Sequence, residues 1–225
     1  MYNFLMITDN FNICIVSTDK EFAQAMAVRR EVFIDEYKIA EQKEFDGNDF
    51  GATHILALDG HKPIGTMRIR YFNGFVKMER MCVIKDFRKT DVSEKIMQKA
   101  MLFAAQKGYE KVYGVCKKEL LNRWKQNGFE PIAGAKTVEQ NSMTLIPVVC
   151  NLPKVENVIT MQTEAQILNA KEGTWFDLAQ SDAVMRIKNL TDKVKQIKQP
   201  LQTTNKNPQS DFVYPLSHKT DDKSY

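Results

Sequence analysis

The stretch KMERMCVIKDFRKTDVSEKIMQKAM, residues 77–101, changes its hydrophobic period part-way along and so determines the fold. Its first half belongs to GFVKMERMCVI, residues 74–84, which is typical of a strand. Its second half repeats apolar residues at helical spacing, which predicts a helix. Asp91 and Glu94 are spaced as a capping box at the start of this helix, and Gly108 is placed to stop it.

On either side of this stretch the sequence predicts further elements. Asn73-Gly74 marks a tight hairpin turn before the strand, and a second turn is expected at Gly60-His61-Lys62. The resulting order predicts an α+β fold, in which a mixed and mostly antiparallel sheet is flanked by helices. The other strands are expected at 12–16, 53–59, 63–72, 111–116 and 142–150, and the other helices from Thr18 or Asp19 to Phe33 and over 117–129.

Beyond residue 150 the pattern weakens. Amphipathic helices are predicted over 160–172 and 182–199, and polar composition predicts a disordered tail. The expected organisation is therefore a main domain over 1–150, a helical extension over 151–199 and the tail over 200–225. Trp175 and Phe176 are expected to anchor the extension to an apolar surface.

The composition excludes several classes of protein. The 225 residues are 43% hydrophobic and 27% charged with a net charge of +4, so neither a disordered chain nor a nucleic-acid partner is indicated. Four widely spaced cysteines without a CxxC pair predict neither a metal site nor a disulfide framework. No long apolar run or leader-like N-terminus is found, so a cytoplasmic location without membrane contact is expected.

Several ordered pieces of sequence carry a family resemblance: VRREVFIDEYKI, ATHILALDGHKPIGTMRIR, MERMCV, RKTDVS and NGFEP. Over roughly residues 12–150 the chain thereby resembles the GNAT superfamily of N-acyltransferases, especially its small bacterial acetyltransferases. The resemblance implies an N-acetyltransferase that moves an acetyl group from acetyl-CoA to an amine by direct attack in a ternary complex. The acceptor is either a small-molecule amine or a protein amine, and the oligomeric state is left open, a dimer included.

The resemblance also implies where the cofactor binds. The strand residues that would pair with the pantetheine arm are Met81, Cys82 and Val83. The turn that would hold the pyrophosphate is Arg88, Lys89, Thr90, Asp91, Val92 and Ser93, at a helix N-terminus that suits phosphate oxygens.

Asp91 departs from the family pattern, which has glycine at this position. A carboxylate at ~5 Å from a phosphate would cost roughly 3 kcal/mol at an effective dielectric of ~20. The alternative is that Asp91 points outward and caps its helix.

The catalytic groups are less clear from the sequence. Glu79 is the candidate general base, and the alternative is a structural role in an ion pair with Arg80 or Arg68. Trp124 stands where many members of the superfamily have a tyrosine that protonates the leaving thiolate. The acid is therefore expected to be water or another residue.

Charged residues leave two further hypotheses open. Arg29, Arg30, Arg68 and Arg70 are expected to form an internal ion network with Glu31, Glu44 or Asp46. The same order of residues is similar to acyl-homoserine-lactone and N-acyl amino acid synthases, which take longer acyl chains from acyl carrier protein. A third hypothesis is a GNAT-fold binding module without catalysis.

Charge is unevenly distributed along the chain. Residues 85–125 hold eleven Lys and Arg against five Asp and Glu, whereas residues 31–50 hold two Lys against seven acids. The basic segment fits a polyphosphate cofactor, and the acidic one favours a cationic acceptor if it borders the acceptor groove. His54, Cys82 and Cys116 are expected to be packed residues without catalytic roles.

Overall fold

The computed structural model describes residues 11–140 and 143–175. The chain divides into two compact units, and these residues all belong to the first, Met1–Ser181. The helix predicted over 182–199, the tail predicted over 200–225 and Phe176 lie outside the described residues.

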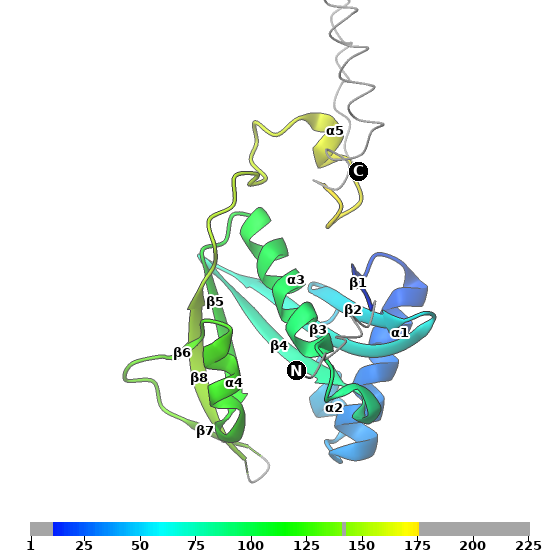
Figure 1. Ribbon diagram of the computed structural model, residues 1–225, viewed down its shortest axis with the longest axis vertical. Helices are drawn as coiled ribbons and strands as arrows, with labels where there is room; N and C mark the ends of the chain where they lie inside the picture. Colours follow the sequence, from blue (N-terminus) through cyan, green and yellow to red (C-terminus); the bar gives the residue numbers. More distant parts are fainter. Residues whose placement is uncertain (1–10, 141–142, 176–225) are drawn as a thin grey trace, which may run out of the picture. The chain divides into compact units, whose positions relative to one another are not determined.

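One eight-stranded sheet forms the centre of an α+β fold (Figure 1). Its neighbouring strands are antiparallel except for β4 and β5, which run parallel, so the predicted mixed and mostly antiparallel sheet is confirmed. Two short strands beside β8 were not predicted. In spatial order the strands are β1 (Asn12–Ile15), β2 (Thr53–Asp59), β3 (Lys62–Phe72), β4 (Phe75–Val83), β5 (Lys111–Lys117), β8 (Met143–Asn151) and β6 (Glu130–Pro131), and β7 (Val138–Gln140) also pairs with β8.

The first helix, α1 (Asp19–Arg29), begins where the sequence predicts. The Thr18 hydroxyl accepts a hydrogen bond from the Glu21 N–H at 3.2 Å, and the Glu21 carboxylate accepts one from the Thr18 N–H at 3.1 Å. This capping box satisfies two N–H groups that the helix itself leaves unpaired. The helix then continues as a π-helix, η1 (Arg30–Glu36). This form is rare overall, and where it occurs it often lies near a functional site.

The helix after the third predicted strand, α3 (Val92–Gln106), is confirmed, but its capping box is wrong. Asp91 precedes the helix with φ −84° and ψ 9°, whereas a capping side chain needs an extended backbone, and it makes no capping hydrogen bond. Gly108 ends the helix as predicted, with a left-handed φ of +85°. The predicted apolar face is buried in full: Val92, Ile96, Ala100, Phe103 and Ala104.

The helices α1 and α3 cover opposite faces of the sheet. A Cβ at Gly65 of β3 would lie 2.8 Å from Ile96 of α3, so this position faces α3. Arg68 is three residues further along the strand and therefore points to the other face, where it shares Asp49 with Arg29 of α1. We call these the α3 face and the α1 face.

The chain after β8 packs on the main domain as an irregular segment. The predicted helix over 160–172 is wrong except for one turn, α5 (Ala165–Leu168). Trp175 stacks on Phe103 of α3 with ring centroids 5.4 Å apart, which confirms its predicted anchoring role. Single apolar contacts of this kind replace the continuous face that an amphipathic helix would present. The remaining short helices are α2 (Glu41–Glu44), η2 (Lys85–Phe87), η3 (Lys118–Leu120) and α4 (Leu121–Gln126).

Candidate active site

The strands β4 and β5 separate part-way along their length. They pair only where Val76–Met78 lies beside Val112–Gly114, and Figure 1 shows them diverging beyond this point. A cavity of about 220 Å³ lies in the gap, lined by Met81 of β4 and Cys116 of β5 among others. Because the two strands no longer pair with each other there, an extended ligand with N–H and C=O groups can pair with their backbones.

A β-bulge in β4 borders the cavity. Thr66 of β3 pairs with Cys82 and Arg68 pairs with Glu79, so two residues of β4 oppose one residue of β3 between these pairs. Arg80, one of the two, has a left-handed φ of +56°, which is uncommon for a non-glycine residue. Bulges bend strands and are frequent beside active sites. No feature of the sequence predicts this one.

The end of the cavity at the α1 face is charged. Lys43 and Glu44 of α2 and Glu79 and Arg80 of β4 line it, and Phe33 adds an apolar wall. Only Glu79 among these charged residues was predicted as a site residue. Lys43 and Glu44 come from a short helix that was not predicted, whereas Arg80 lies on the predicted strand β4.

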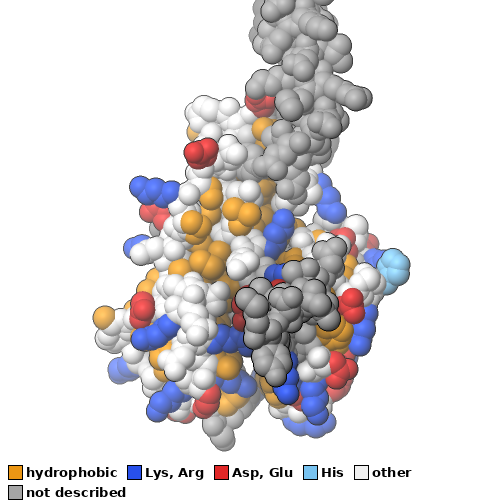
Figure 2. All heavy atoms as spheres, in the orientation of Figure 1, with side chains coloured by type: hydrophobic (Ala, Val, Ile, Leu, Met, Phe, Trp, Pro, Cys, Tyr) orange, Lys and Arg blue, Asp and Glu red, His pale blue; other side chains and the backbone are white. Residues whose placement is uncertain are grey.

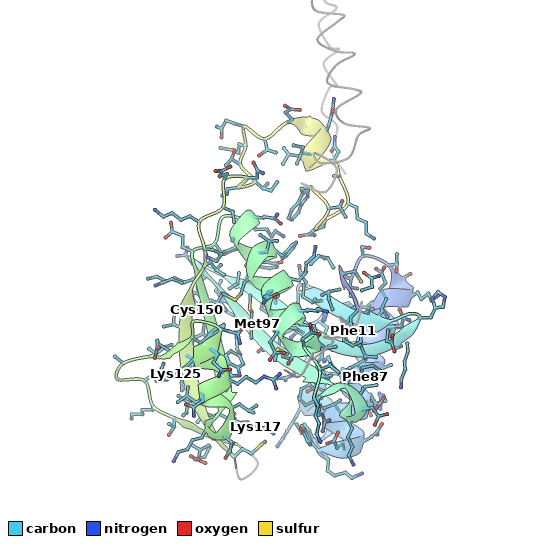
Figure 3. The ribbon with its side chains drawn as sticks, viewed as in Figure 1. Phe11, Phe87, Met97, Lys117, Lys125 and Cys150 are labelled. Carbon is cyan, nitrogen blue, oxygen red and sulfur yellow. The ribbon has the colours of Figure 1, made fainter. Side chains whose placement is uncertain are left out.

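The other end of the cavity is apolar and leads toward α3. Met81, Leu120 and Trp124 line the main cavity and also a second one of about 70 Å³, which reaches Ser93 in the first turn of α3. Met97 of α3, labelled in Figure 3, also lines the second cavity. The two cavities therefore form a path from the charged end, through the gap between the strands, to the N-terminus of α3.

The three strand residues predicted to hold the pantetheine arm are not equivalent. The side chain of Met81 lines both cavities, whereas Cys82 and Val83 are buried and do not line either one. Burial raises the pKa of the Cys82 thiol, in agreement with its predicted role as a packed residue. The Val83 carbonyl accepts a hydrogen bond of 2.9 Å from Arg88 Nε. The side chains of Cys82 and Val83 therefore do not line the cavities, and the Val83 carbonyl is already engaged by Arg88.

Arg88 connects the predicted phosphate loop to η1. Its Nη1 donates to Glu36 Oε1 at 2.7 Å, and its guanidinium lies over the Tyr37 ring, 5.8 Å from the centroid. The hydrogen bond to Glu36 and burial act in opposite directions, and the net effect raises the pKa of Arg88. The guanidinium is therefore fixed at the loop but already paired, so an anion bound there would compete with Glu36.

Asp91 points away from the loop interior. Its side chain is 54% exposed and forms an ion pair of 3.1 Å with Lys95, one turn further along α3. This agrees with the outward orientation considered from the sequence, although without the helix cap. Solvent therefore weakens the electrostatic repulsion between the Asp91 carboxylate and a bound phosphate.

The rest of the predicted loop is mixed. Lys89 is exposed, Val92 is buried in the core, and Thr90 is half-buried with its hydroxyl bonded to the backbone. Ser93 accepts a hydrogen bond of 2.6 Å from Arg123 of α4. The loop thus presents Lys89 and the first N–H groups of α3, while α4 supplies a further arginine that the sequence analysis did not select.

Trp124 is a packing residue in α4. Only 9% of it is exposed, and its ring lies edge-on to Phe129 with centroids 4.8 Å apart. A Cβ at Gly114 of β5 would lie 2.7 Å from Trp124 Cζ3, so the indole fits only because this position is glycine. Trp124 therefore forms a wall shared by both cavities.

A buried ion network lies under the charged end of the cavity, as predicted. Arg29 Nε contacts Glu44 Oε1 at 2.6 Å, and Arg29 also pairs with Asp49. Arg68 Nη1 contacts Asp46 at 2.7 Å and Asp49 at 2.8 Å. Asp49, which pairs with both arginines, lies in the loop before β2 and was not among the predicted members.

The outer members of the predicted network do not join its buried part in the same way. Arg30 pairs with Glu41 at the surface, and Arg70 lies 3.8 Å from Glu79. Glu31, a predicted member, forms no ion pair within residues 11–140 and 143–175. The network is therefore built on the residues that face the sheet.

Glu79 and Glu44 both line the cavity but differ as proton acceptors. Arg68 Nη2 and Lys77 Nζ contact Glu79 at 2.7 and 2.6 Å. Burial alone raises the pKa of Glu79, but Lys77 and Arg68 outweigh it, so the net pKa is lowered. Burial dominates at Glu44, whose pKa is raised despite Arg29 and Arg80. The catalytic role of Glu79 stays a prediction, and Glu44 joins it as a candidate.

The other singled-out side chains have packing roles. His54 is 2% exposed, stands edge-on to Phe22 at 5.3 Å between ring centroids, and burial lowers its pKa. Cys116 is also buried, which raises the pKa of its thiol. Both are therefore packed as predicted, and Cys116 also lines the main cavity. No group of three His, Cys, Asp or Glu side chains in the described part of the chain is placed to hold a metal ion.

Basic side chains surround the path to α3. Figure 2 shows Lys and Arg side chains over α4 and the adjoining strand ends, and Figure 3 labels Lys117 and Lys125 there. Lys117 Nζ lies 4.5 Å from the centroid of Tyr37. A ligand that carries phosphates is favoured at this end.

Within the described ranges, no helix combines the length and apolar character needed to cross a membrane.

Comparison with known proteins agrees with this geometry. The family model described as "Acetyltransferase (GNAT) family" matches residues 22–129, which include the diverging strands and the start of α3. Two proteins of Bacillus subtilis are similar in sequence. "Uncharacterized N-acetyltransferase YjcF" is 37% identical over 42% of this chain and 66% of its own length, and "Uncharacterized protein YyaT" is 33% identical over 43% and 68%.

The chain belongs to the GNAT family of acetyltransferases. Solved structures share its fold. An acyl-CoA N-acyltransferase from Pseudomonas aeruginosa superimposes with a TM-score of 0.57 at 20% identity, covering 62% of this chain and 99% of that one. Escherichia coli ElaA gives a TM-score of 0.57 at 19% identity over 62% and 99%. The shared fold therefore covers 62% of this chain.

Proposed function

We propose that this GNAT-family protein is an acetyl-CoA-dependent N-acetyltransferase. The observation that carries the proposal is the pair of adjoining cavities beside the gap between β4 and β5. They share Met81, Leu120 and Trp124 as lining residues and reach from the charged end to the first turn of α3. An acyl-CoA has a matching distribution of groups: a reactive thioester, an extended amide-containing arm and phosphates. The acceptor amine would approach from the charged end.

Each part of the path supports one segment of the donor. Backbone groups of Met81, Cys82 and Val83 would pair with the amides of the arm. Arg88, Lys89 and the first N–H groups of α3 would hold the pyrophosphate, with Arg88 released from Glu36. The remaining residues of the turn, Thr90, Asp91, Val92 and Ser93, would set its backbone geometry.

Bound acetyl-CoA supplies a thioester carbonyl that the acceptor nitrogen attacks directly, and the CoA thiolate leaves. Before attack the acceptor ammonium must lose a proton, and Glu79 or Glu44 would accept it, directly or through water. The described residues that line the cavity include no tyrosine to protonate the thiolate. Water is the proposed acid.

A calorimetric titration of acetyl-CoA into the full chain tests this proposal, followed by thiol release with a panel of amines. We expect binding at one site, about tenfold weaker in Arg88→Gln, because a charge-assisted hydrogen bond is worth about 1.5–3 kcal/mol. Lys20→Gln, an exposed change on α1, is the control and should bind normally. Absence of binding by the wild type refutes the proposal. Binding without turnover of any amine would favour a binding module.

Transfer of a longer acyl chain is a second candidate. Met67 and Met78 line the cavity and are otherwise buried, so an apolar surface continues beside the point where the strands separate. Turnover with hexanoyl-CoA or hexanoyl acyl carrier protein that clearly exceeds turnover with acetyl-CoA would support this candidate. A preference for acetyl-CoA would reject it.

A further inference from the structure

The cations at the charged end of the cavity exceed the carboxylates. Four acids form the network beneath and beside it: Glu44, Asp46, Asp49 and Glu79. Six cations lie among or next to them: Arg29, Arg68, Arg70, Lys77, Arg80 and Lys43. The three acids of the run 31–50 that lie here, Glu44, Asp46 and Asp49, are therefore neutralised by their arginine partners.

Lys43 is a cation at the charged end that is available to a ligand. It lines the cavity and is exposed, and no ion pair or hydrogen bond of its ammonium group is found among residues 11–140 and 143–175. Its backbone is held in place, because Arg80 Nη2 donates to the Lys43 carbonyl at 3.0 Å. Arg80 is itself fixed by the bulge and by Glu44, whose Oε2 lies 2.9 Å from Arg80 Nε.

The two carboxylates that reach the cavity are already engaged. Glu79 is contacted by Arg68 and Lys77, and Glu44 by Arg29 and Arg80. A cationic acceptor without an anionic group would meet excess positive charge. An acceptor that carries a carboxylate beside its amine would instead gain an ion pair with Lys43 while its amine lies toward Glu79 and Glu44.

Apolar residues complete this end of the cavity. Phe33 and Ile39 line it beside Lys43. We infer that the acceptor is an amino acid with a free carboxylate and an apolar side chain, and that Lys43 recognises the carboxylate. This inference rests on the proposed N-acetyltransferase function and specifies its substrate class.

Matched acceptors test the inference in the full 225-residue chain with acetyl-CoA as donor. L-leucine, L-methionine and L-phenylalanine are each compared with the corresponding carboxamide, with thiol release as the readout. We expect kcat/KM to be at least about tenfold higher for the acids, consistent with one charge-assisted contact. The amine of each amide is less basic and more often neutral, so intrinsic reactivity opposes this preference.

The variant Lys43→Gln should raise KM for the preferred acid about tenfold and leave KM for its amide and the Kd of acetyl-CoA unchanged. Lys43→Arg should retain the preference, and Lys20→Gln is the control. Equal or better turnover of the amides overturns the inference, as does an equal effect of Lys43→Gln on acid and amide. Turnover of none of the three acids by a protein that binds acetyl-CoA also overturns it, while failure to bind acetyl-CoA refutes the proposed function itself.

Discussion

Replacing Asp91 tests how the departure from the family glycine affects the donor site. The side chain is 54% exposed and paired with Lys95 at 3.1 Å. Two unit charges about 8 Å apart in water-like surroundings interact by only about 0.5 kcal/mol, and a pyrophosphate would double this. The exposed pair with Lys95 contributes about 0–1 kcal/mol. We therefore expect Asp91→Gly to change the Kd of acetyl-CoA by less than about fivefold.

Calorimetric titration of acetyl-CoA into the wild type, Asp91→Gly and Asp91→Asn gives the measurement. The Asn variant removes the charge and keeps a side chain, so it separates electrostatics from the backbone freedom that glycine adds. A hundredfold tightening in both variants would contradict the outward orientation of this carboxylate. Tightening in Asp91→Gly alone would mean that backbone conformation, and not charge, limits the site.

Three further substitutions test the fold around the site. Trp175→Ala should lower the free energy of unfolding in urea by about 3–5 kcal/mol, because it removes the contact with Phe103. The control Phe50→Ala, at a side chain that is 91% exposed, should have little effect. Equal effects of the two variants would argue against the anchoring contact. Gly114→Ala should cost about 1–3 kcal/mol because the methyl group would press on Trp124, and an unchanged urea midpoint would contradict this packing. Hydrogen bonds from Arg68 hold the pKa of Asp46 below its ordinary 3.8, so the contribution of Asp46 to the free energy of unfolding should be full above about pH 5 and decline below about pH 4. The variant Asp46→Asn should remove this part of the acid dependence. Parallel profiles of unfolding free energy against pH for the wild type and the variant would refute this expectation.

Local patterns in the sequence were sufficient to predict most of the fold. The alternation before Val83 and the helical spacing after Val92 place β4 and α3 within a residue of the structure. Thr18 and Gly108 mark helix ends because capping and left-handed stops have local chemical signals. Short strands and one-turn helices, such as β6 and α2, lack such signals because long-range contacts alone stabilise them.

The candidate site was predictable only in part. Met81 lines the cavity and Arg88 contacts the Val83 carbonyl beside the predicted turn, while the roles of both in donor binding stay predictions. The bulge at Arg80 depends on the pairing of β3 with β4, and the contact between Arg80 and the Lys43 carbonyl joins residues 37 positions apart. A single sequence reveals neither. An arginine network around Glu44 and Asp46 was expected from the sequence, but only the fold determines which carboxylates each arginine contacts.

Hydrogen–deuterium exchange of the full chain with and without acetyl-CoA tests the central claim most directly, namely that the donor lies between β4 and β5. We predict slower exchange in peptides that cover Glu79–Val83 and the first turn of α3, because their backbone N–H groups would gain partners. Peptides from β1 and β2, remote from the gap in the sheet order, should be unchanged. Protection confined to other segments, or none in a protein that binds acetyl-CoA, would contradict the proposed donor site.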